Sequence, residues 1–450
     1  MVRRYIEAFL PAAQAAGLGQ VRFHIRQTHS RMVSVYRGEP EQSVQSEECC
    51  LLIEGEAGGY SGSAYVGDLR PEGCEEAIRL IRESALGRKL PFVPFQLPDL
   101  PDPGEEPNDR LPLPELIRRL AAAEQAAYDA DGRVELVHGC SLSEYWGRVT
   151  LADSTGRFVT DRVSGGHFQI SLTARQGGLV QLGERGCPMA LGCYPDMELL
   201  ARQAALDASG MLDASSYPTG HSPVVLDSRV MCELLDAFLP AFFAKNVQSR
   251  TSVLAGKLGE TIAGELAVIE EDPFLPDGLC RRRFDDEGVP TAAKTILSHG
   301  ILRTYFCDRQ SAAWCGLPPG GNGFRPTYAA EVGPGYTNVI FRTGQLSRDE
   351  LLASMGSGLL ITGVSGVFAG ANPASGDFSL LSHGYRVRDG RICGGVSQIT
   401  VAGNFFELLQ QTKGVGNDGT WMHSGAGCLC APSVYVALLA ISGGEMLNRL

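Results

Sequence analysis

Positive charge is scarce in this chain of 450 residues. Its 39 lysines and arginines are outnumbered by 51 aspartates and glutamates, which gives a formal net charge of −12 and a pI near 5.3. Nucleic-acid binding needs basic side chains that neutralise phosphates, so we expect no nucleic-acid partner. The one cluster of three basic residues, Arg281–Arg283, is followed at once by Asp285–Glu287, a mixture typical of a solvated loop.

Long apolar runs and regular cysteine spacings are also missing. There is no run of about 18 apolar residues, so we expect neither a transmembrane helix nor a membrane partner. The 13 cysteines are an odd number without a CxxC pair, which argues against a disulfide framework. Scattered cysteines of this kind are typical of reduced, mostly buried thiols, and we expect a cytoplasmic protein.

Two familiar site patterns occur without the context or the spacing that their function needs. Residues 414–419 match GxGxxG, but a helical segment precedes them and none follows, which is not the context of a dinucleotide site. Ser365 lies in Gly363–Gly366, which lacks the spacing of a nucleophile elbow. No Walker A sequence is present. We interpret both segments as turns.

Glycine and proline, by contrast, are abundant, with 55 and 25 copies, and predict many turns and strands. Eight prolines between residues 91 and 114 mark an extended linker. We therefore divide the chain into an N-terminal α+β unit (1–90), the linker (91–114), a central α+β unit (115–221) and a β-rich C-terminal domain (222–450). The predicted class is α+β, with antiparallel sheets and helices in the N-terminal region.

Hydrophobic periodicity predicts the elements within these units. Helices are expected at 2–16, 72–86, 114–128, 196–214, 229–243, 347–355 and 404–413. Strands are expected at 21–25, 32–36, 43–53 and 60–66, and again at 133–139, 145–151, 157–163 and 167–175, with His24 and His29 on either side of a hairpin. The order helix, strands, helix recurs in the two units and suggests a duplication.

Glycine-rich segments follow one another in a distinctive order near the C-terminus. They read GANPASGDFS at 370–379, GYRV at 384–387, GVSQITVAGN at 395–404, FELL at 406–409 and GVGND at 414–418. This order resembles the C-terminal domain of the TldD/PmbA family, two-subunit metallopeptidases once named modulators of DNA gyrase. The resemblance covers most of the chain and implies a β-rich C-terminal domain of that type.

The family contains chains with a zinc-binding HExxxH helix and similar chains without it. In those chains the HExxxH motif precedes a segment similar to residues 251–260 here. Counting back from that segment places the first position of the motif at Leu235. The degenerate zinc-site positions are then Leu235, Asp236, Leu239 and Pro240, and helix 229–243 contains no histidine. Because zinc hydrolysis needs imidazole or carboxylate ligands and a general base, we expect no catalytic residue, metal or cofactor in this chain.

One local His/Cys cluster remains, formed by His423, Cys428 and Cys430. Catalytic subunits of the family take a third zinc ligand from a cysteine in this general region, so Cys428 is a degenerate zinc-site position or a buried thiol. The minor alternatives are a metal site here, or a Cys428 or Cys430 nucleophile with His423 as its base.

Polar side chains in the glycine-rich turns are candidates for binding an extended peptide. Asn and Asp form turns through their own hydrogen bonds, but they also offer hydrogen bonds to a ligand beside glycines that permit close approach. The candidates are Asn372, Asp377, Asn404, Asn417 and Asp418.

The resemblance implies a non-catalytic, PmbA/TldE-like subunit of a zinc metallopeptidase that acts on unfolded or small peptides. Zinc would be held by a TldD-like HExxxH partner in a heterodimer, or the chain would pair with itself. The alternative from another functional class is a stand-alone homodimeric peptide-binding or scaffold protein without catalysis.

Overall fold

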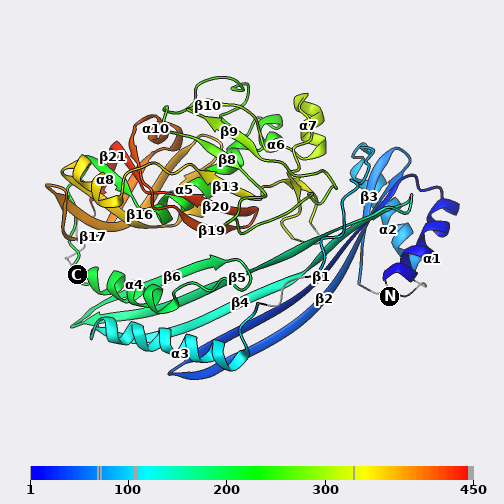
Figure 1. Ribbon diagram of the computed structural model, residues 1–450. Coiled ribbons are helices and arrows are strands. Elements are labelled where there is room, and N and C mark those ends of the chain that lie inside the picture. Colours follow the sequence, from blue (N-terminus) through cyan, green and yellow to red (C-terminus); the bar gives the residue numbers. More distant parts are fainter. Residues whose placement is uncertain (1, 68–69, 71–72, 106–108, 328–329, 444–450) are drawn as a thin grey trace.

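The computed structural model describes residues 2–67, 70, 73–105, 109–327 and 330–443. An N-terminal sheet with four helices forms one part of the molecule, and a β-rich C-terminal domain lies along that sheet (Figure 1). The predicted α+β class is therefore confirmed. None of the helices in the described part of the chain is long and apolar enough to cross a membrane.

The N-terminal sheet contains six antiparallel strands in the order β3-β2-β1-β4-β5-β6. Their bounds are β1 Val21–Tyr36, β2 Glu39–Ala57, β3 Tyr60–Val66, β4 Val134–Asp153, β5 Phe158–Gln176 and β6 Leu179–Met189. The helices are α1 Val2–Ala15, α2 Cys74–Arg88, α3 Leu113–Ala130 and α4 Met197–Gly210. Each of the two N-terminal units consists of a helix, three strands and a second helix, so the predicted order does recur. The pairing of β1 with β4 joins the two units into one continuous sheet.

The strands are longer than hydrophobic periodicity predicts. The expected hairpin between His24 and His29 is wrong, because both residues lie on β1, which pairs continuously with β2 and β4 over residues 22–34. Residues 26–30 in the middle of β1 are exposed or half-buried, so the apolar alternation stops there while the hydrogen-bond ladder continues. Strands β4 and β5 each merge two predicted strands in the same way, and β6 was not predicted.

The proline-rich segment 91–112 is not a free tether. Leu97 is buried against Leu151 and Val159 of the N-terminal sheet and Phe284 of the C-terminal domain. The part of the segment around Leu97 therefore packs between the two parts of the molecule.

The C-terminal domain contains two larger sheets and one short pair of strands, β11 (Gly323–Phe324) with β12 (Gly333–Pro334). One sheet holds β7 Gly220–Leu226, β14 Gly358–Ser365, β15 Ala371–Asn372, β16 Asp377–Arg388, β17 Arg391–Asn404, β18 Thr412–Val415 and β21 Val434–Gly443. The other holds β8 Ile269–Glu271, β9 Lys294–Ser298, β10 Ile301–Leu302, β13 Asn338–Phe341, β19 Thr420–Ser424 and β20 Gly427–Ala431.

Helix α5 (Ser228–Phe238) packs in the core that these two sheets share. Its Phe238 ring stacks on Phe405 with 4.8 Å between centroids. The α-helix is shorter than predicted because Pro240 cannot donate a backbone hydrogen bond, and Leu239–Phe242 continues as a 3-10 turn. The remaining helices are α6 Ala244–Gln248, α7 Arg309–Cys315, α8 Arg348–Met355, α9 Val367–Gly370 and α10 Phe405–Gln410.

The charged segment 281–287, expected to be a solvated loop, is instead part of the contact between the two parts. Asp285 and Asp286 are buried. Asp286 Oδ1 lies 3.2 Å from Nε2 of His24 on β1 and accepts a 2.8 Å hydrogen bond from Arg282. The mixed charges neutralise one another inside the protein, which is why they resembled a solvated loop in the sequence.

Candidate functional site

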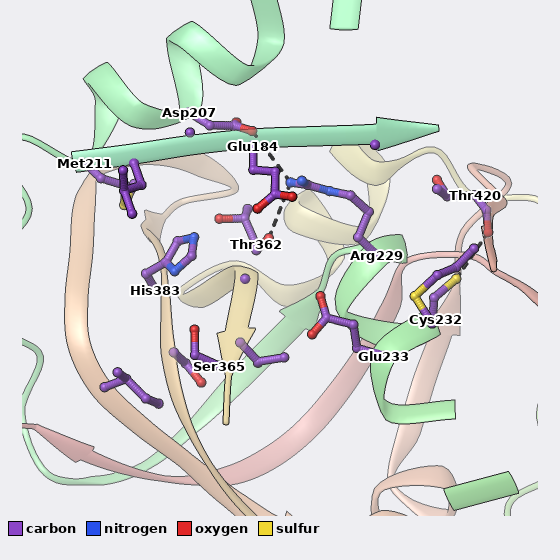
Figure 2. Close-up of a pocket in the computed structure, with 18 of the residues that line it drawn as sticks. Glu184, Asp207, Met211, Arg229, Cys232, Glu233, Thr362, Ser365, His383 and Thr420 are labelled. Carbon is purple, nitrogen blue, oxygen red and sulfur yellow. Dashed lines mark hydrogen bonds and ion pairs between the residues drawn. The ribbon is translucent and has the colours of Figure 1, made fainter. Parts of the chain in front are cut away.

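A cleft of about 860 Å³ lies where the N-terminal sheet meets the C-terminal domain (Figure 2). Its walls come from β5, β6 and α4 on one side and from α5, β14, β16, β17 and β19 on the other. The charged side chains and histidines that line it are His167, Glu184, Asp207, Arg229, Glu233, His383 and His423. A mixed polar and apolar cleft of this size, between two structural units, is the usual setting of a ligand site.

Helix α5 presents one side to this cleft. Its N-cap, Asp227, accepts a hydrogen bond of 3.1 Å from the backbone N–H of Arg229 and so starts the helix at the cleft. Helical spacing then places Arg229, Cys232 and Glu233 on the cleft side. Leu235, three residues after Cys232, is fully buried in the core and does not line the cleft.

Two of these three residues have partners. Arg229 lies 3.7 Å from Asp207 of α4 and donates to the carbonyl of Thr362 at 3.4 Å (Figure 2). Cys232 donates its thiol to the carbonyl oxygen of Thr420 at 3.2 Å, and burial raises its pKa, so it remains a neutral thiol. The pair between Arg229 and Asp207 also joins the C-terminal domain to helix α4 across the cleft.

Glu233 is different, because no hydrogen bond or ion pair to it is found among the described residues. Its carboxyl group points into the cleft (Figure 2). Burial raises its pKa to about 7, against the opposing effect of Arg229. At neutral pH this group is therefore divided between its acid and carboxylate forms.

The three histidines of the cleft are held in the neutral form, since burial lowers the pKa of each of them. Nδ1 of His423 lies 3.1 Å from Sγ of Cys428. Cys428 is only 2% exposed, and a hydrogen bond with the Cys280 thiol, together with burial, raises its pKa strongly. A neutral, buried thiol is a poor nucleophile, which argues against the cysteine-enzyme alternative.

The degenerate zinc-site positions lie away from any donor set that fits zinc. Leu235 and Leu239 are fully buried among apolar side chains, and Pro240 stands in the 3-10 turn. Asp236 accepts a hydrogen bond of 3.1 Å from the hydroxyl of Tyr336. Within the described ranges, no group of three or more His, Cys, Asp and Glu side chains is arranged to hold a metal. These residues do not fit the zinc of the catalytic chains.

The five peptide-binding candidates lie outside the lining of the cleft. Strand pairing brings Asn372, Asp377 and Asn404 together, and Asn404 donates to Asp377 at 2.9 Å and caps α10. Asn417 and Asp418 lie in another turn, where Asp418 accepts from the backbone and hydroxyl of Ser433. All five thus have roles in turns, and their contact with a peptide stays a prediction.

Sequence reasoning did not identify the cleft or its α5 residues. The available signal was the polar stripe of Arg229, Cys232 and Glu233, which lie three and four residues apart and are followed at the same spacing by Asp236. Asp207 could not be connected with it from the sequence, because their contact depends on how two distant helices pack.

Comparison with known proteins agrees with this architecture. Residues 219–443 match the PmbA/TldA metallopeptidase C-terminal domain, and residues 106–212 match the central domain of the same group. The metalloprotease PmbA of Escherichia coli O157:H7 is 27% identical over 409 residues, which are 88% of this chain and 86% of that protein. A metalloprotease TldD homolog of Haemophilus influenzae is 26% identical over 381 residues, 81% of this chain and 78% of that protein.

Two solved structures share the fold over nearly the whole chain. A protein of Thermotoga maritima, described as a putative modulator of a DNA gyrase, has a TM-score of 0.85 and 28% identity over 98% of this chain and 100% of its own. TldE from Thermococcus kodakarensis has a TM-score of 0.88 at 22% identity, with the same coverage, and this likeness concerns the fold alone. Two domain matches along one chain, together with these full-length likenesses, identify the protein as a member of the PmbA/TldD metallopeptidase family.

Proposed function

We propose that this chain is the non-catalytic, PmbA/TldE-like subunit of a two-subunit cytoplasmic zinc metallopeptidase that acts on unfolded or small peptides. The observation that carries the proposal is the composition of helix α5. It turns Arg229, Cys232 and Glu233 toward the cleft and contains no histidine. Zinc and its activated water would then come from an HExxxH-bearing partner, and this chain would contribute peptide binding and enclosure.

The cleft supports the peptide-binding part of this proposal. Its volume of about 860 Å³ is large enough for a short stretch of extended peptide. Its walls contain hydroxyl and amide side chains, such as Ser365, Ser397 and Gln398, as well as apolar ones, such as Leu381 and Met422. Such a lining suits a ligand that itself alternates polar main chain and varied side chains.

Association with a second chain is supported by the surface beside α5. The ring of Phe368 on the short helix α9 is fully exposed, and Leu381 on neighbouring β16 is 57% exposed. Exposed aromatic side chains of this kind commonly anchor protein–protein contacts. We propose that a TldD-like subunit covers this area.

The test compares the purified chain alone with the chain co-purified with its HExxxH homologue. Bound zinc and cleavage of an unfolded peptide are measured in both preparations. We expect stoichiometric zinc and cleavage in the mixture, and neither in the chain alone. A matched control replaces the first histidine of the partner's HExxxH by alanine, which should abolish cleavage without separating the two chains.

Other outcomes exclude the proposal in different ways. Zinc-dependent cleavage by the chain alone would mean that it holds a complete active site. No association and no cleavage, with a stable dimer of this chain that binds peptide, would favour the stand-alone binding protein.

A further inference from the structure

The starting point is the unpaired carboxyl group of Glu233 in a cleft where the neighbouring polar groups have partners. Arg229, one turn earlier on α5, contacts Asp207, Asp227 and the carbonyl of Thr362. Cys232 is bonded to the carbonyl of Thr420. Glu233 is half-buried, and within the described residues it has neither a hydrogen bond nor an ion pair. A carboxyl group in this situation gains free energy when a ligand supplies a donor.

The charges that face the cleft favour a cationic ligand. Three carboxyl groups line it, those of Glu184, Asp207 and Glu233, against the single guanidinium of Arg229. Asp207 is bound by Arg185 at 2.5 Å as well as by Arg229, so its charge is balanced within the protein. The histidines of the lining are neutral and do not offset the remaining acidic groups. Glu184 is exposed and accepts a hydrogen bond from Gln169, so solvent screens its charge. The remaining negative charge is therefore centred on Glu233.

We propose that the cleft contains a subsite for an ammonium or guanidinium group of the bound peptide, with Glu233 as its counter-ion. The group is either the free α-amino end of the peptide or the side chain of a lysine or arginine. The inference rests on the proposed function, because it takes a peptide as the ligand. It adds that the cleft prefers peptides with a cationic group. A charged donor at a half-buried carboxylate makes a stronger hydrogen bond than a neutral donor does.

The proposal predicts how binding depends on pH. In the free cleft the carboxyl group of Glu233 has a pKa of about 7, so it is largely protonated below that pH and ionised above it. A peptide with a lysine side chain, which stays cationic over this range, should therefore bind more tightly as the pH rises from about 6 to about 8. For a free α-amino end, whose own pKa is about 8, the gain should end at about pH 7.5. A peptide without a cationic group should not gain affinity over this range.

The test uses three fluorescent peptides of one unfolded sequence and the full chain. The first peptide has a free α-amino end and no basic side chain, the second is acetylated and contains one lysine, and the third is acetylated and has no cation. We expect the third to bind about tenfold more weakly than at least one of the other two, which corresponds to one charged pair. Comparison of the first two distinguishes recognition of the peptide end from recognition of a side chain.

Two variants locate the subsite. Glu233→Gln should remove the preference for the cationic peptides and their pH dependence. Glu184→Gln is the matched control, since Glu184 lies in the same cleft but is exposed and already bonded to Gln169 at 2.6 Å. It should leave the preference within about twofold of that of the unmodified chain.

The possible failures can be told apart. Equal binding of the three peptides to the unmodified chain would overturn the cationic subsite while leaving peptide binding intact. A preference that persists in Glu233→Gln would overturn the role of Glu233. Absence of binding for all three peptides, with and without the HExxxH partner, would contradict the proposed function itself. Because the peptide series is measured on the unmodified chain, the proposal can be tested even if a variant does not fold.

Discussion

The backbone carbonyl of Glu287 accepts a hydrogen bond of 2.7 Å from Nη1 of Arg22. Arg22 lies on β1 and also donates to Glu54 on β2 through Nε, at 2.9 Å. Although burial acts in the opposite direction, Arg22 and Arg325 hold the pKa of Glu54 at about 2. The segment around Glu287 therefore connects the C-terminal domain to strands β1 and β2, where Arg22 and Glu54 remain charged. The protonation state of the Glu287 side chain should in turn affect the stability of the protein.

Glu287 should make the protein less stable as the pH rises. Burial, and next the nearby Asp285, raise the pKa of its side chain from 4.5 to about 8. Between these values the folded protein holds a proton that the unfolded chain has released, so the free energy of unfolding falls with increasing pH. Glu287→Gln keeps the neutral form at every pH, and urea unfolding should show it to be more stable than the unmodified protein at about pH 8.

The informative quantity is the difference between the two proteins, because Asp285 has a pKa raised to about 6 by burial and contributes a slope of the same sign. That difference should shrink at about pH 5. The exposed Glu265 provides the control, since Glu265→Gln should leave the pH dependence unchanged. A variant at Glu287 that loses stability in parallel with the unmodified protein from about pH 5 to about pH 8 would contradict the assignment.

Gly183 sets the distance between β6 and helix α4 at the edge of the cleft. A Cβ atom added there would lie 2.2 Å from the backbone carbonyl oxygen of Ala204 on α4. The helix would have to move, so we expect Gly183→Ala to lower the free energy of unfolding by about 1–3 kcal/mol and to weaken peptide binding. Gly178 has open space around its Cβ direction, and Gly178→Ala should have little effect. Equal urea midpoints for the two variants would show that α4 is free to adjust.

Leu235 tests whether the zinc site of the catalytic chains could be restored by replacing single residues. Its side chain is fully buried in the core around α5 and does not line the cleft. Leu235→His should bind no zinc and should destabilise the protein by about 2–5 kcal/mol, because it buries a polar ring without a partner. Leu235→Met, which keeps the apolar character, should cost less than about 1.5 kcal/mol. A stable histidine variant that retains zinc after dialysis would mean that this position can face a metal.

Elements whose pattern is complete within a short segment are predictable from the sequence, whereas those that depend on distant packing are not. Helix α3 was predicted at 114–128 and runs over Leu113–Ala130, because its apolar spacing is complete within the helix itself. For β1 the sequence predicts two strands, at 21–25 and 32–36, because the side chains at 26–30 interrupt the apolar alternation. The backbone hydrogen bonds continue through these residues, so the structure has one strand. The sequence does not single out Glu233, because the family motif falls on Leu235, two residues further along. Which side of α5 faces the cleft depends on the packing of α4, and one sequence does not contain that information.

Cys280 and Cys428 are brought together by a residue between them. Asn338 is the strand partner of Cys428, and its side chain accepts from the backbone N–H of Cys280 at 2.8 Å and donates to the carbonyl of Cys280 at 3.0 Å. The two thiols are hydrogen-bonded to each other. The Cys428 thiol, and next the charge of Arg282, lower the pKa of Cys280 despite the effect of burial.

Cys280 should therefore be the most reactive of the half-buried thiols. Cys315 is the natural comparison, because it is equally half-buried and bonded to another thiol, that of Cys307, but burial raises its pKa. Because a lower pKa increases the thiolate fraction at neutral pH, iodoacetamide at about pH 7 should label Cys280 faster than Cys315, as followed by peptide mass spectrometry. Cys428→Ala removes the donor and should slow the labelling, whereas Cys428→Ser keeps a donor and should restore it. Labelling of Cys280 at the rate of Cys315, or faster labelling in Cys428→Ala, would show that the neighbouring thiol does not stabilise the Cys280 thiolate.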